Sequence, residues 1–311
     1  MKLDLATRGS QLARWQARTT QALLRDTDPG LEVELEVIES SGDLDQASAL
    51  ARFGRIGIFT VEVDRALLDG RAQIGVHSCK DMTTSLMDGI CLAGVLPRGP
   101  VEDVLVSPAG HTLDELPEGA RVASGSLRRK AQLLAQRPDL QVIDIRGNVD
   151  TRLRKLRDGE AEALLLARAG LERLGLGEHI TEVLDTERFL PAVSQGIVGL
   201  TCRSDDEATQ ALLKSIRDEA SWDQALAERS LLRNLNGGCN APIAGHALIQ
   251  GDQLTLRGRV LSLDGERELE SELKGPRTQA EALGVSLAES LREMGADELV
   301  EQARVAAEKQ D

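Results

Sequence analysis

The chain has 311 residues, a length typical of two or three domains, and its hydrophobic content of 41% is ordinary for a globular protein. Aromatic residues make up only 2% and there is no tyrosine, so the cores must be built from Leu, Val, Ile and Ala. This composition excludes a base-stacking surface for single-stranded nucleic acid. The net charge of -14 argues against nucleic acid or an anionic membrane as a partner.

The sequence begins without an apolar run and reaches transmembrane length nowhere, so we expect neither a secretory signal nor a membrane span. The four cysteines, Cys79, Cys91, Cys202 and Cys239, are far apart and form no CxxC pair. This spacing predicts no disulfide framework and no metal site, and it fits the reducing cytoplasm. We interpret the first three as structural, because they lie in apolar or strand-like contexts.

Short apolar runs alternate with amphipathic stretches over the first two-thirds of the chain, which favours βαβ units in parallel or mixed sheets. The elements predicted there, in order, are strand 3–5, helix 11–25, strand 31–38, helix 61–68, strands 73–77, 90–96, 104–107 and 121–123, helix 127–136, strand 142–145, helix 149–157 and strand 163–167. The last third predicts helix 221–235, strands 247–249, 254–261 and 266–273, and helices 279–294 and 297–309. Strands followed by helices indicate a separate small α+β domain.

Arginines gather where predicted strands give way to helices. The first such turn holds Ser124, Ser126, Arg128 and Arg129, with Ser126 as a plausible N-cap. Two cations in the first turn of a helix oppose its dipole at a cost of about 0.3–1 kcal/mol each when exposed. They therefore indicate either a bound anion or pairing with surface acids.

Two further turns repeat this arrangement. One holds Arg146, Gly147, Asn148 and Arg152, with Arg146 at the end of a strand and Asn148 as a possible cap. The other, which is a weaker signal, holds Arg173. Because loops at the carboxyl ends of parallel strands form the ligand crevice, repetition in consecutive βα units favours an anion site.

The first βα series carries polar residues in the same places. Arg8 and Ser10 follow the first strand, and Ser78, Lys80 and Asp81 follow a later one. The planar fork of arginine suits bidentate capture of carboxylates, so we expect a ligand with several carboxylates. A lysine beside an aspartate can bind an anion and also stabilise a cation or move a proton, although a surface ion pair is the alternative.

A loop in the last third presents a cysteine. Cys239 follows Gly237 and Gly238 and precedes Pro242, which predicts a tight loop that exposes the thiol. Most isolated cysteines are buried and inert, and only this context sets Cys239 apart. His77 carries no such context, and we interpret it as structural.

Taken in order, these residues resemble the hydroxymethylbilane synthase (porphobilinogen deaminase) family over essentially the whole chain. The segments that carry the resemblance are 6–10, 76–81, 126–129, 140–152 with its Arg-Gly-Asn-Val core, 190–196 and 237–239. Each segment alone is a weak signal, and the ordered set is specific.

The resemblance implies an α/β fold with two domains like those of type II periplasmic binding proteins and a small C-terminal α+β domain. Residues 1–97 with 197–216 would form domain 1, residues 101–192 the arginine-rich domain 2, and residues 219–311 the domain that carries Cys239. The chain would cross twice, so that residues 197–201 return to domain 1 as a strand.

The resemblance also implies the reaction, that of a transferase. Four molecules of porphobilinogen are deaminated and joined head to tail on a dipyrromethane cofactor, which a thioether links to the loop cysteine, here Cys239. Water then releases the linear tetrapyrrole. Asp81 would stabilise the cationic pyrrole N–H groups and move protons. The residues implied to bind the carboxylates of cofactor, substrate and growing polypyrrole are Arg8, Ser10, Ser78, Lys80, Ser124, Ser126, Arg128, Arg129, Arg146, Gly147, Asn148, Arg152 and Arg173.

The family also implies a mobile segment, here residues 52–59, with Arg52, Arg55 and Phe59. This sequence departs from the family pattern at four positions, namely Ile56, Thr83, Gly125 and Ser194, and Ser194 stands where glycine is usual. We expect these departures to affect rate and loop gating rather than identity. No interface stripe is evident, so a monomer is predicted.

Two other readings fit the arginines. One is a non-catalytic anion-binding module of the periplasmic-binding-protein type, which would need neither Cys239 nor a third domain. The other is a transferase that grips phosphorylated substrates, although no GxxxxGK[ST] or GxGxxG motif supports it.

Overall fold

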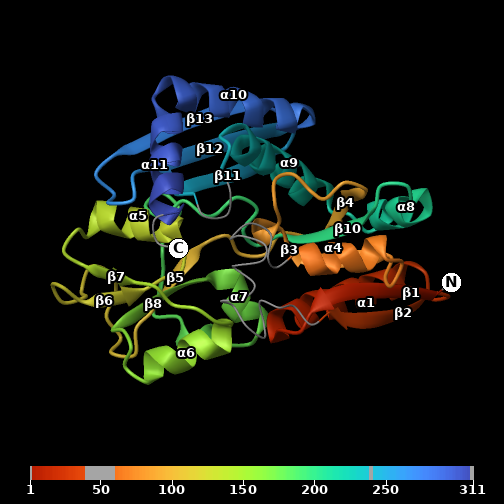
Figure 1. The fold of residues 1–311 in the computed structure, drawn as a ribbon, viewed down its shortest axis with the longest axis horizontal. Coiled ribbons are helices and arrows are strands. Elements are labelled where there is room, and N and C mark those ends of the chain that lie inside the picture. The colour runs from red at the N-terminus through yellow and green to blue at the C-terminus, as the bar shows by residue number, and fades with distance from the viewer. Residues whose placement is uncertain (1, 39–59, 238–240, 309–311) are drawn as a thin grey trace. The chain divides into compact units, whose positions relative to one another are not determined.

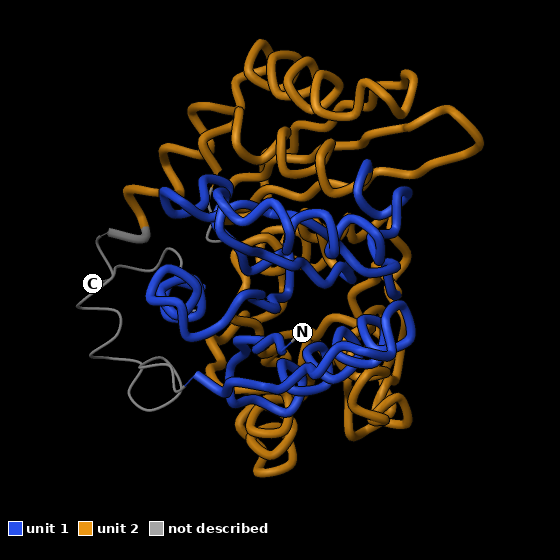
Figure 2. Tube along the Cα trace, turned by 90° about the vertical axis from the view of Figure 1, so that its right-hand side faces the viewer, with its two compact units in different colours: residues 1–99, 196–223 blue, residues 100–195, 224–311 orange. Residues whose placement is uncertain are grey.

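A computed structural model describes residues 2–38, 60–237 and 241–308. The chain forms two compact units, unit 1 (Met1–Gly99 with Gly196–Asp223) and unit 2 (Pro100–Gln195 with Gln224–Asp311), which Figure 2 shows in different colours. The chain therefore leaves unit 1 after Gly99 and returns to it at Gly196. Within the described ranges, no helix combines the length and the apolar character that a membrane span requires.

Unit 1 is built on a five-stranded mixed sheet in the order β2-β1-β3-β10-β4 (Figure 1). β1 (Lys2–Arg8) pairs in parallel with both β2 (Glu32–Ile38) and β3 (Ile74–Ser78). β10 (Val198–Arg203) runs antiparallel to both β3 and β4 (Ile90–Val95). The chain leaves unit 1 after β4 and re-enters it at β10, and these two strands are neighbours in the sheet.

Helices cover both faces of this sheet. Leu5 of β1 shares a buried cluster with residues of α1 (Gln11–Thr27) and α8 (Glu207–Ser215). The next residue, Ala6, faces the other side and packs with α4 (Val61–Leu68). This alternation is what the pleat of a strand requires when both faces are covered.

Unit 2 contains a second five-stranded sheet in the order β7-β6-β8-β5-β9. β6 (Arg121–Ala123) is parallel to β7 (Gln141–Ile143) and to β8 (Ala163–Ala167). β5 (Asp103–Val106) is antiparallel to β8 and to β9 (Glu182–Val183). The two sheets thus share one strand order. In each, the strand that follows the passage of the chain from the other unit (β10 or β5) runs antiparallel to both of its neighbours.

Helices also cover both faces of the second sheet. α5 (Leu127–Gln136) packs on one face through Leu133, while α6 (Val149–Arg157) and α7 (Arg168–Arg173) pack on the other. A short 3₁₀ turn, η2 (Gly177–His179), follows α7.

The rest of unit 2 is a three-stranded antiparallel sheet under helices (Figure 1). Its strands are β11 (Ile243–Gln250), β12 (Gln253–Leu261) and β13 (Glu268–Pro276), and its helices are η3 (Arg277–Gln279), α10 (Ala280–Glu293) and α11 (Ala296–Glu308). The helix α9 (Glu219–Asn234) begins in unit 1 and continues into this part of unit 2 from Gln224. Arg259 of β12 is buried and ties this sheet to the preceding one, because its guanidinium donates to the backbone oxygens of Glu187 and Arg188 at 3.0 and 2.9 Å.

The α/β fold class and the small C-terminal α+β part are confirmed, and so is the return of residues 197–201 as a strand of the first sheet. The expected aliphatic core is confirmed too, since the largest fully buried side chains are Phe189 and otherwise Leu, Ile and Met. α7 and α8 were not predicted as helices. α7 has six residues and α8 has nine, so both are too short for a helical period to stand out. The boundaries of the three domains stay a prediction.

Candidate active site

The polar residues of unit 1 lie where parallel strands end. Ser10 caps α1, and its hydroxyl accepts a hydrogen bond from the backbone N–H of Ala13 at 3.2 Å. Gln16, on the same helix, donates from Nε2 to Ser78 Oγ at 2.8 Å. This bond joins α1 to the end of β3, so the loop after β1, which follows Arg8, and the loop after β3 belong to one edge of the sheet.

Lys80 and Asp81 lie in η1 (Cys79–Asp81), a single 3₁₀ turn after β3. The backbone N–H of Cys79 donates to Ile197 O at 3.0 Å, and that of Met82 donates to Cys79 O at 3.2 Å. Cys79 and Met82 are buried, whereas Lys80 and Asp81 are half-buried. The turn therefore holds an ammonium and a carboxylate side by side at the edge of the sheet, within reach of a ligand.

A buried polar network lies behind this turn. His77 Nε2 is 3.0 Å from Thr201 Oγ1 and 3.3 Å from Asp64 Oδ1. All three side chains are buried, and Gly75 leaves them room, because a Cβ there would lie 2.9 Å from His77 Nε2. The network binds β3 to α4 and β10, which supports the interpretation of His77 as structural.

In unit 2, three loops follow the parallel strands β6, β7 and β8. Ser126 caps α5 and accepts from the backbone N–H of Arg129 at 3.5 Å, while its own N–H donates to Ser124 Oγ at 3.3 Å. The predicted N-cap is therefore confirmed, and the two serines fix the turn in which the arginines begin.

Arg128 and Arg129 are not solvent-facing cations but form a buried cluster with Asp103 of β5. Arg128 Nη2 lies 2.7 Å from Asp103 Oδ2, and Arg129 donates to Oδ1 from Nε and Nη2 at 3.0 and 2.7 Å. Gln195 Nε2 adds a bond to Oδ1 at 2.9 Å. Arg128 Nη1 also donates to Leu190 O at 2.7 Å.

The sequence indicated either a bound anion or surface acids as partners of these two arginines. The structure shows a third possibility, a buried carboxylate on another strand. Burial alone would raise the pKa of Asp103, but the charges of Arg128 and Arg129 outweigh it and hold that pKa well below its usual range. The sequence signalled that Asp103 needs a cation but not which residues supply it. Asp103 opens an otherwise apolar strand, Asp-Val-Leu-Val, and a carboxylate in such a strand needs a cation.

The loop after β7 leaves its arginines more accessible. Arg146 is exposed and pairs with Asp144 at 2.8 Å. The prediction that it directly ends the strand is wrong, because β7 already stops at Ile143. Asn148 caps α6 by accepting from Thr151 N–H at 2.9 Å, as predicted.

Gly147 and Arg152 shape the same loop. Gly147 has a φ of 113° and a Cβ there would lie 2.6 Å from Thr151 Cγ2, so glycine is required. Arg152 Nε donates to Gly147 O at 2.8 Å, which draws its guanidinium back over the loop.

The third arginine-bearing segment forms α7 rather than an open turn. Arg168 pairs with Glu172 at 2.6 Å and with Glu102 at 3.2 Å. Arg173 is half-buried, and burial lowers the pKa of its guanidinium. Of the two, Arg173 is the one whose desolvated charge would gain more from a bound carboxylate.

Cys239, Arg52, Arg55, Ile56 and Phe59 lie outside the described residues. The residues that precede the loop of Cys239, at the end of α9, are described. α9 ends in a Schellman motif, in which Gly237 N–H donates to Leu232 O at 3.0 Å and Asn236 N–H to Arg233 O at 3.1 Å. Asn236 takes a left-handed φ of 51°.

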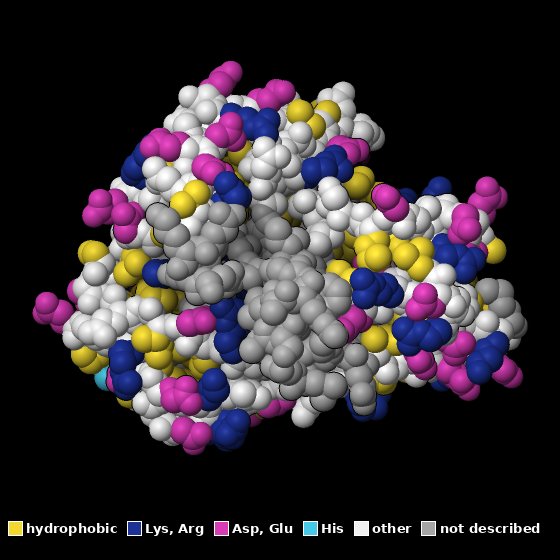
Figure 3. Space-filling model, in the orientation of Figure 1, with side chains coloured by type: hydrophobic (Ala, Val, Ile, Leu, Met, Phe, Trp, Pro, Cys, Tyr) yellow, Lys and Arg dark blue, Asp and Glu magenta, His cyan; other side chains and the backbone are white. Residues whose placement is uncertain are grey.

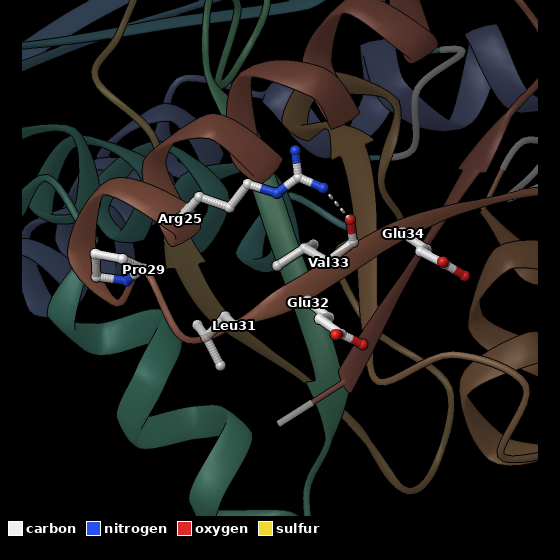
Figure 4. A pocket seen from close by; sticks show the side chains of 6 residues that line it. All are labelled: Arg25, Pro29, Leu31, Glu32, Val33 and Glu34. Carbon is white, nitrogen blue, oxygen red and sulfur yellow. Dashed lines mark hydrogen bonds between the residues drawn. The ribbon is translucent and has the colours of Figure 1, made fainter.

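A hollow on the surface of unit 1 does not suit a carboxylate ligand. The hollow, of about 460 Å³, lies beside Arg25 and the outer strand β2, with Glu32 and Glu34 at its rim, and Arg25 donates into Val33 O rather than toward the opening (Figure 4). This acidic rim is the wrong charge for a carboxylate ligand. Acidic and basic side chains are interspersed over the face seen in Figure 3. Among residues 2–38, 60–237 and 241–308, no group of His, Cys, Asp and Glu is arranged to hold a metal ion.

Comparison with known proteins decides the family. Residues 3–211 match the family model described as "Porphobilinogen deaminase, dipyromethane cofactor binding domain", and residues 222–293 match "Porphobilinogen deaminase, C-terminal domain". The chain belongs to the porphobilinogen deaminase family. The porphobilinogen deaminase of Syntrophomonas wolfei is 44% identical over 293 residues, which cover 94% of this chain and 96% of the relative. That of Syntrophotalea carbinolica is 43% identical over 298 residues, which cover 96% and 95%.

Solved structures similar to this chain include the methionine binding protein MetQ, with a TM-score of 0.44, 16% identity and coverage of 73% of this chain and 94% of that one. The amino-acid ABC transporter binding protein YtmK of Bacillus subtilis has a TM-score of 0.44 at 12% identity and covers 74% of this chain and 96% of that one.

Three of the four positions at which the sequence departs from the expected family pattern lie in the described residues. Ser194 has a φ of 60° and is buried, so it takes a conformation that favours glycine. Gly125 packs closely, since a Cβ there would lie 2.9 Å from Ile145 O. Thr83 donates to Ser85 O at 2.6 Å and stabilises the segment after Asp81.

Proposed function

We propose that this chain is a hydroxymethylbilane synthase, a transferase that deaminates four porphobilinogen molecules and joins them head to tail for tetrapyrrole biosynthesis. The observation that carries the proposal is a match to both porphobilinogen deaminase domains over nearly the whole chain. The half-buried Lys80–Asp81 turn at the end of β3 supports it, because the reaction needs an accessible carboxylate beside a cation.

The residues present fit a dipyrromethane cofactor, which brings carboxylates and pyrrole N–H groups. In unit 2, Arg128 Nε is buried and has no hydrogen-bond acceptor in the described part of the chain. A buried guanidinium N–H of this kind is costly unless a ligand supplies an oxygen. In unit 1, the Asp81 carboxylate is an acceptor for N–H groups. When bound, the cofactor supplies the primer on which the pyrrole chain grows.

Asp81 is proposed as the catalytic residue. Loss of ammonia from porphobilinogen leaves positive charge that is shared with the pyrrole nitrogen, and a carboxylate near that N–H stabilises the charge. The same carboxylate can accept and return the proton when the new carbon–carbon bond forms. The short η1 turn fixes its position, since Cys79 and Met82 are buried beneath it.

The remaining residues are proposed to bind carboxylates. Each pyrrole carries one acetate and one propionate, so each addition brings two negative charges, which arginine forks neutralise. The proposed unit 1 set is Arg8, Ser10, Ser78 and Lys80, and the proposed unit 2 set is Ser124, Ser126, Arg128, Arg129, Arg146, Gly147, Asn148, Arg152 and Arg173. Arg52, Arg55 and Phe59 are proposed to belong to a mobile segment near the substrate.

Cys239 is proposed as the thioether anchor of the cofactor. Support comes from the loop's flanks, because the Schellman motif and the close packing of Gly237 against Leu232 and Ile243 fix where the loop begins. We further propose that residues 1–97 with 197–216, 101–192 and 219–311 act as three domains of a cytoplasmic monomer. The wide spacing of the cysteines along the sequence, with no CxxC pair, fits a reducing compartment.

The proposal is tested by Asp81→Asn, which keeps the shape of the side chain but removes its charge. We expect tetrapyrrole formation from porphobilinogen to fall by about 100-fold or more, because a charge that stabilises the transition state is lost. Asp88→Asn, an exposed aspartate of the same segment, is the matched control and should retain wild-type turnover. If the wild-type protein consumes no porphobilinogen, the proposed function is wrong. If the Asp81→Asn variant turns over porphobilinogen at the wild-type rate, the assignment of Asp81 as the catalytic residue is wrong.

A further inference from the structure

Two cysteines that the proposed reaction does not use lie opposite each other on neighbouring strands of the unit 1 sheet. Cys91 of the edge strand β4 is directly opposite Cys202 of β10, and their Sγ atoms are 3.8 Å apart. Directly opposed residues of antiparallel strands have Cα atoms about 4.5–5.5 Å apart. Disulfides span Cα separations of about 4.4–6.8 Å, so the backbone already has the spacing that a bond requires.

The two thiols differ in access and in ionisation. Cys202 is fully buried, whereas Cys91 is half-buried at the rim of the cluster formed with α1 and α8. The hydrogen bond between them lowers the pKa of Cys91 to about 7 and raises that of Cys202, whose burial adds to the increase. Cys91 Sγ also lies 4.0 Å from Arg203 O. An accessible low-pKa thiol beside a second thiol is the arrangement of redox-active pairs.

We propose that Cys91 and Cys202 form a redox-active dithiol that closes to a disulfide when a hydroperoxide oxidises Cys91. The Cys91 thiolate attacks one peroxide oxygen, the O–O bond breaks, and the leaving hydroxide takes up the proton that Cys91 released. Cys91 is then a sulfenic acid. Cys202 Sγ attacks Cys91 Sγ, the S–S bond forms, the S–O bond breaks, and the hydroxide leaves as water with the Cys202 proton. Two thiols lose two electrons and one hydrogen peroxide gains them.

A Cys91–Cys202 disulfide would join the strand by which the chain leaves unit 1 to the strand by which it returns. β4 leads to Gly99 and β10 starts after Gly196, and Gly99 N–H donates to Gly196 O at 3.0 Å. A bond between Cys91 and Cys202 closes a loop that contains residues 100–195, the first of the two segments that the chain contributes to unit 2. Because cross-linking restricts the unfolded chain, the oxidised protein should unfold at a higher temperature than the reduced protein.

Trypsin separates the three cysteines of the described part, which makes the proposal testable in the holoenzyme. Cys91 falls in the peptide 81–98, Cys202 in 189–203 and Cys79 in 72–80. Reduced holoenzyme is treated with one equivalent of hydrogen peroxide, alkylated with N-ethylmaleimide under denaturing conditions, digested and analysed by mass spectrometry. We expect peptides 81–98 and 189–203 to be joined with the loss of two hydrogens, and a reductant to separate them.

Two variants identify the order of events. Cys202→Ala should leave peroxide-treated Cys91 as a sulfenic acid that dimedone traps, and Cys91→Ser should leave Cys202 alkylatable and give no cross-link. Both variants should keep wild-type porphobilinogen turnover, which shows that they fold and that the dithiol is separate from the active site. A wild-type protein in which Cys91 goes to sulfinic acid without the cross-linked peptide would overturn the proposal, as would a cross-link that involves Cys79.

Discussion

Units 1 and 2 use sheets with the same strand order, yet they hold their proposed ligand-binding residues in different ways. In unit 1, Lys80 and Asp81 are half-buried on a single turn, and the buried polar network of His77 lies behind them. In unit 2, Arg128 and Arg129 are buried and share the carboxylate of Asp103.

The difference shows what each unit contributes to the proposed chemistry. A carboxylate that moves protons must be reached by the reacting atoms, so it sits on a surface turn. An arginine that binds carboxylates in a fixed orientation gains from being held before the ligand arrives, and the internal acid holds it. The predictions below test whether the two sets can be separated in this way.

Removing the buried acid should have the largest effect on stability. Asp103→Asn leaves two buried guanidinium groups without a counter-charge, and we expect the free energy of unfolding to fall by about 3–5 kcal/mol. Asp114→Asn breaks an exposed pair with Arg188 and should change stability far less. Denaturant titration measures both, and equal losses would show that burial does not distinguish the two pairs.

Because Asp103 is buried beside two arginines, we also expect the stability of the protein to depend on pH in acid. The folded-state pKa of Asp103 lies below its unfolded value, so its contribution is fully present above about pH 4 and is lost as the pH falls through the folded value. In thermal melts below about pH 4, the wild type should lose stability more steeply than Asp103→Asn. Parallel curves for the two proteins would contradict the assignment.

Ser194→Gly should stabilise unit 2 by about 1–2 kcal/mol, since glycine accepts a left-handed φ without strain. The change also removes a buried Oγ that has no hydrogen-bond partner in the described part of the chain. The control is Asn236→Gly, an exposed position at a similar φ of 51°, where asparagine is already tolerated and little change is expected. A destabilised Ser194→Gly protein in urea titration would show that the hydroxyl has a role that the fold does not reveal.

The smallest effect should come from an exposed arginine. Arg146→Gln removes a guanidinium that is more than half exposed, and we expect KM for porphobilinogen to rise by up to about fivefold. Its unfolding midpoint should stay at the wild-type value. A large loss of stability would mean that Arg146 is structural, like Arg128.

Much of this organisation could be predicted from the sequence, because it depends on local patterns. Alternating apolar runs gave the strands, and Ser126 and Asn148 are the caps that their turns require. The partner of Arg128 and Arg129 could not be predicted in this way. Asp103 lies on the strand that arrives from the crossing, and only the antiparallel pairing of β5 with β8 brings it under α5. The opposition of Cys91 and Cys202 depends on the same kind of long-range pairing.

The mass of the intact protein tests the central claim most directly. If Cys239 carries the dipyrromethane, protein from a host with normal tetrapyrrole synthesis should exceed its sequence mass by two linked pyrrole units, and Cys239→Ser should have the unmodified mass. An unmodified wild-type protein that still forms tetrapyrrole, or an adduct that survives in Cys239→Ser, would contradict the account.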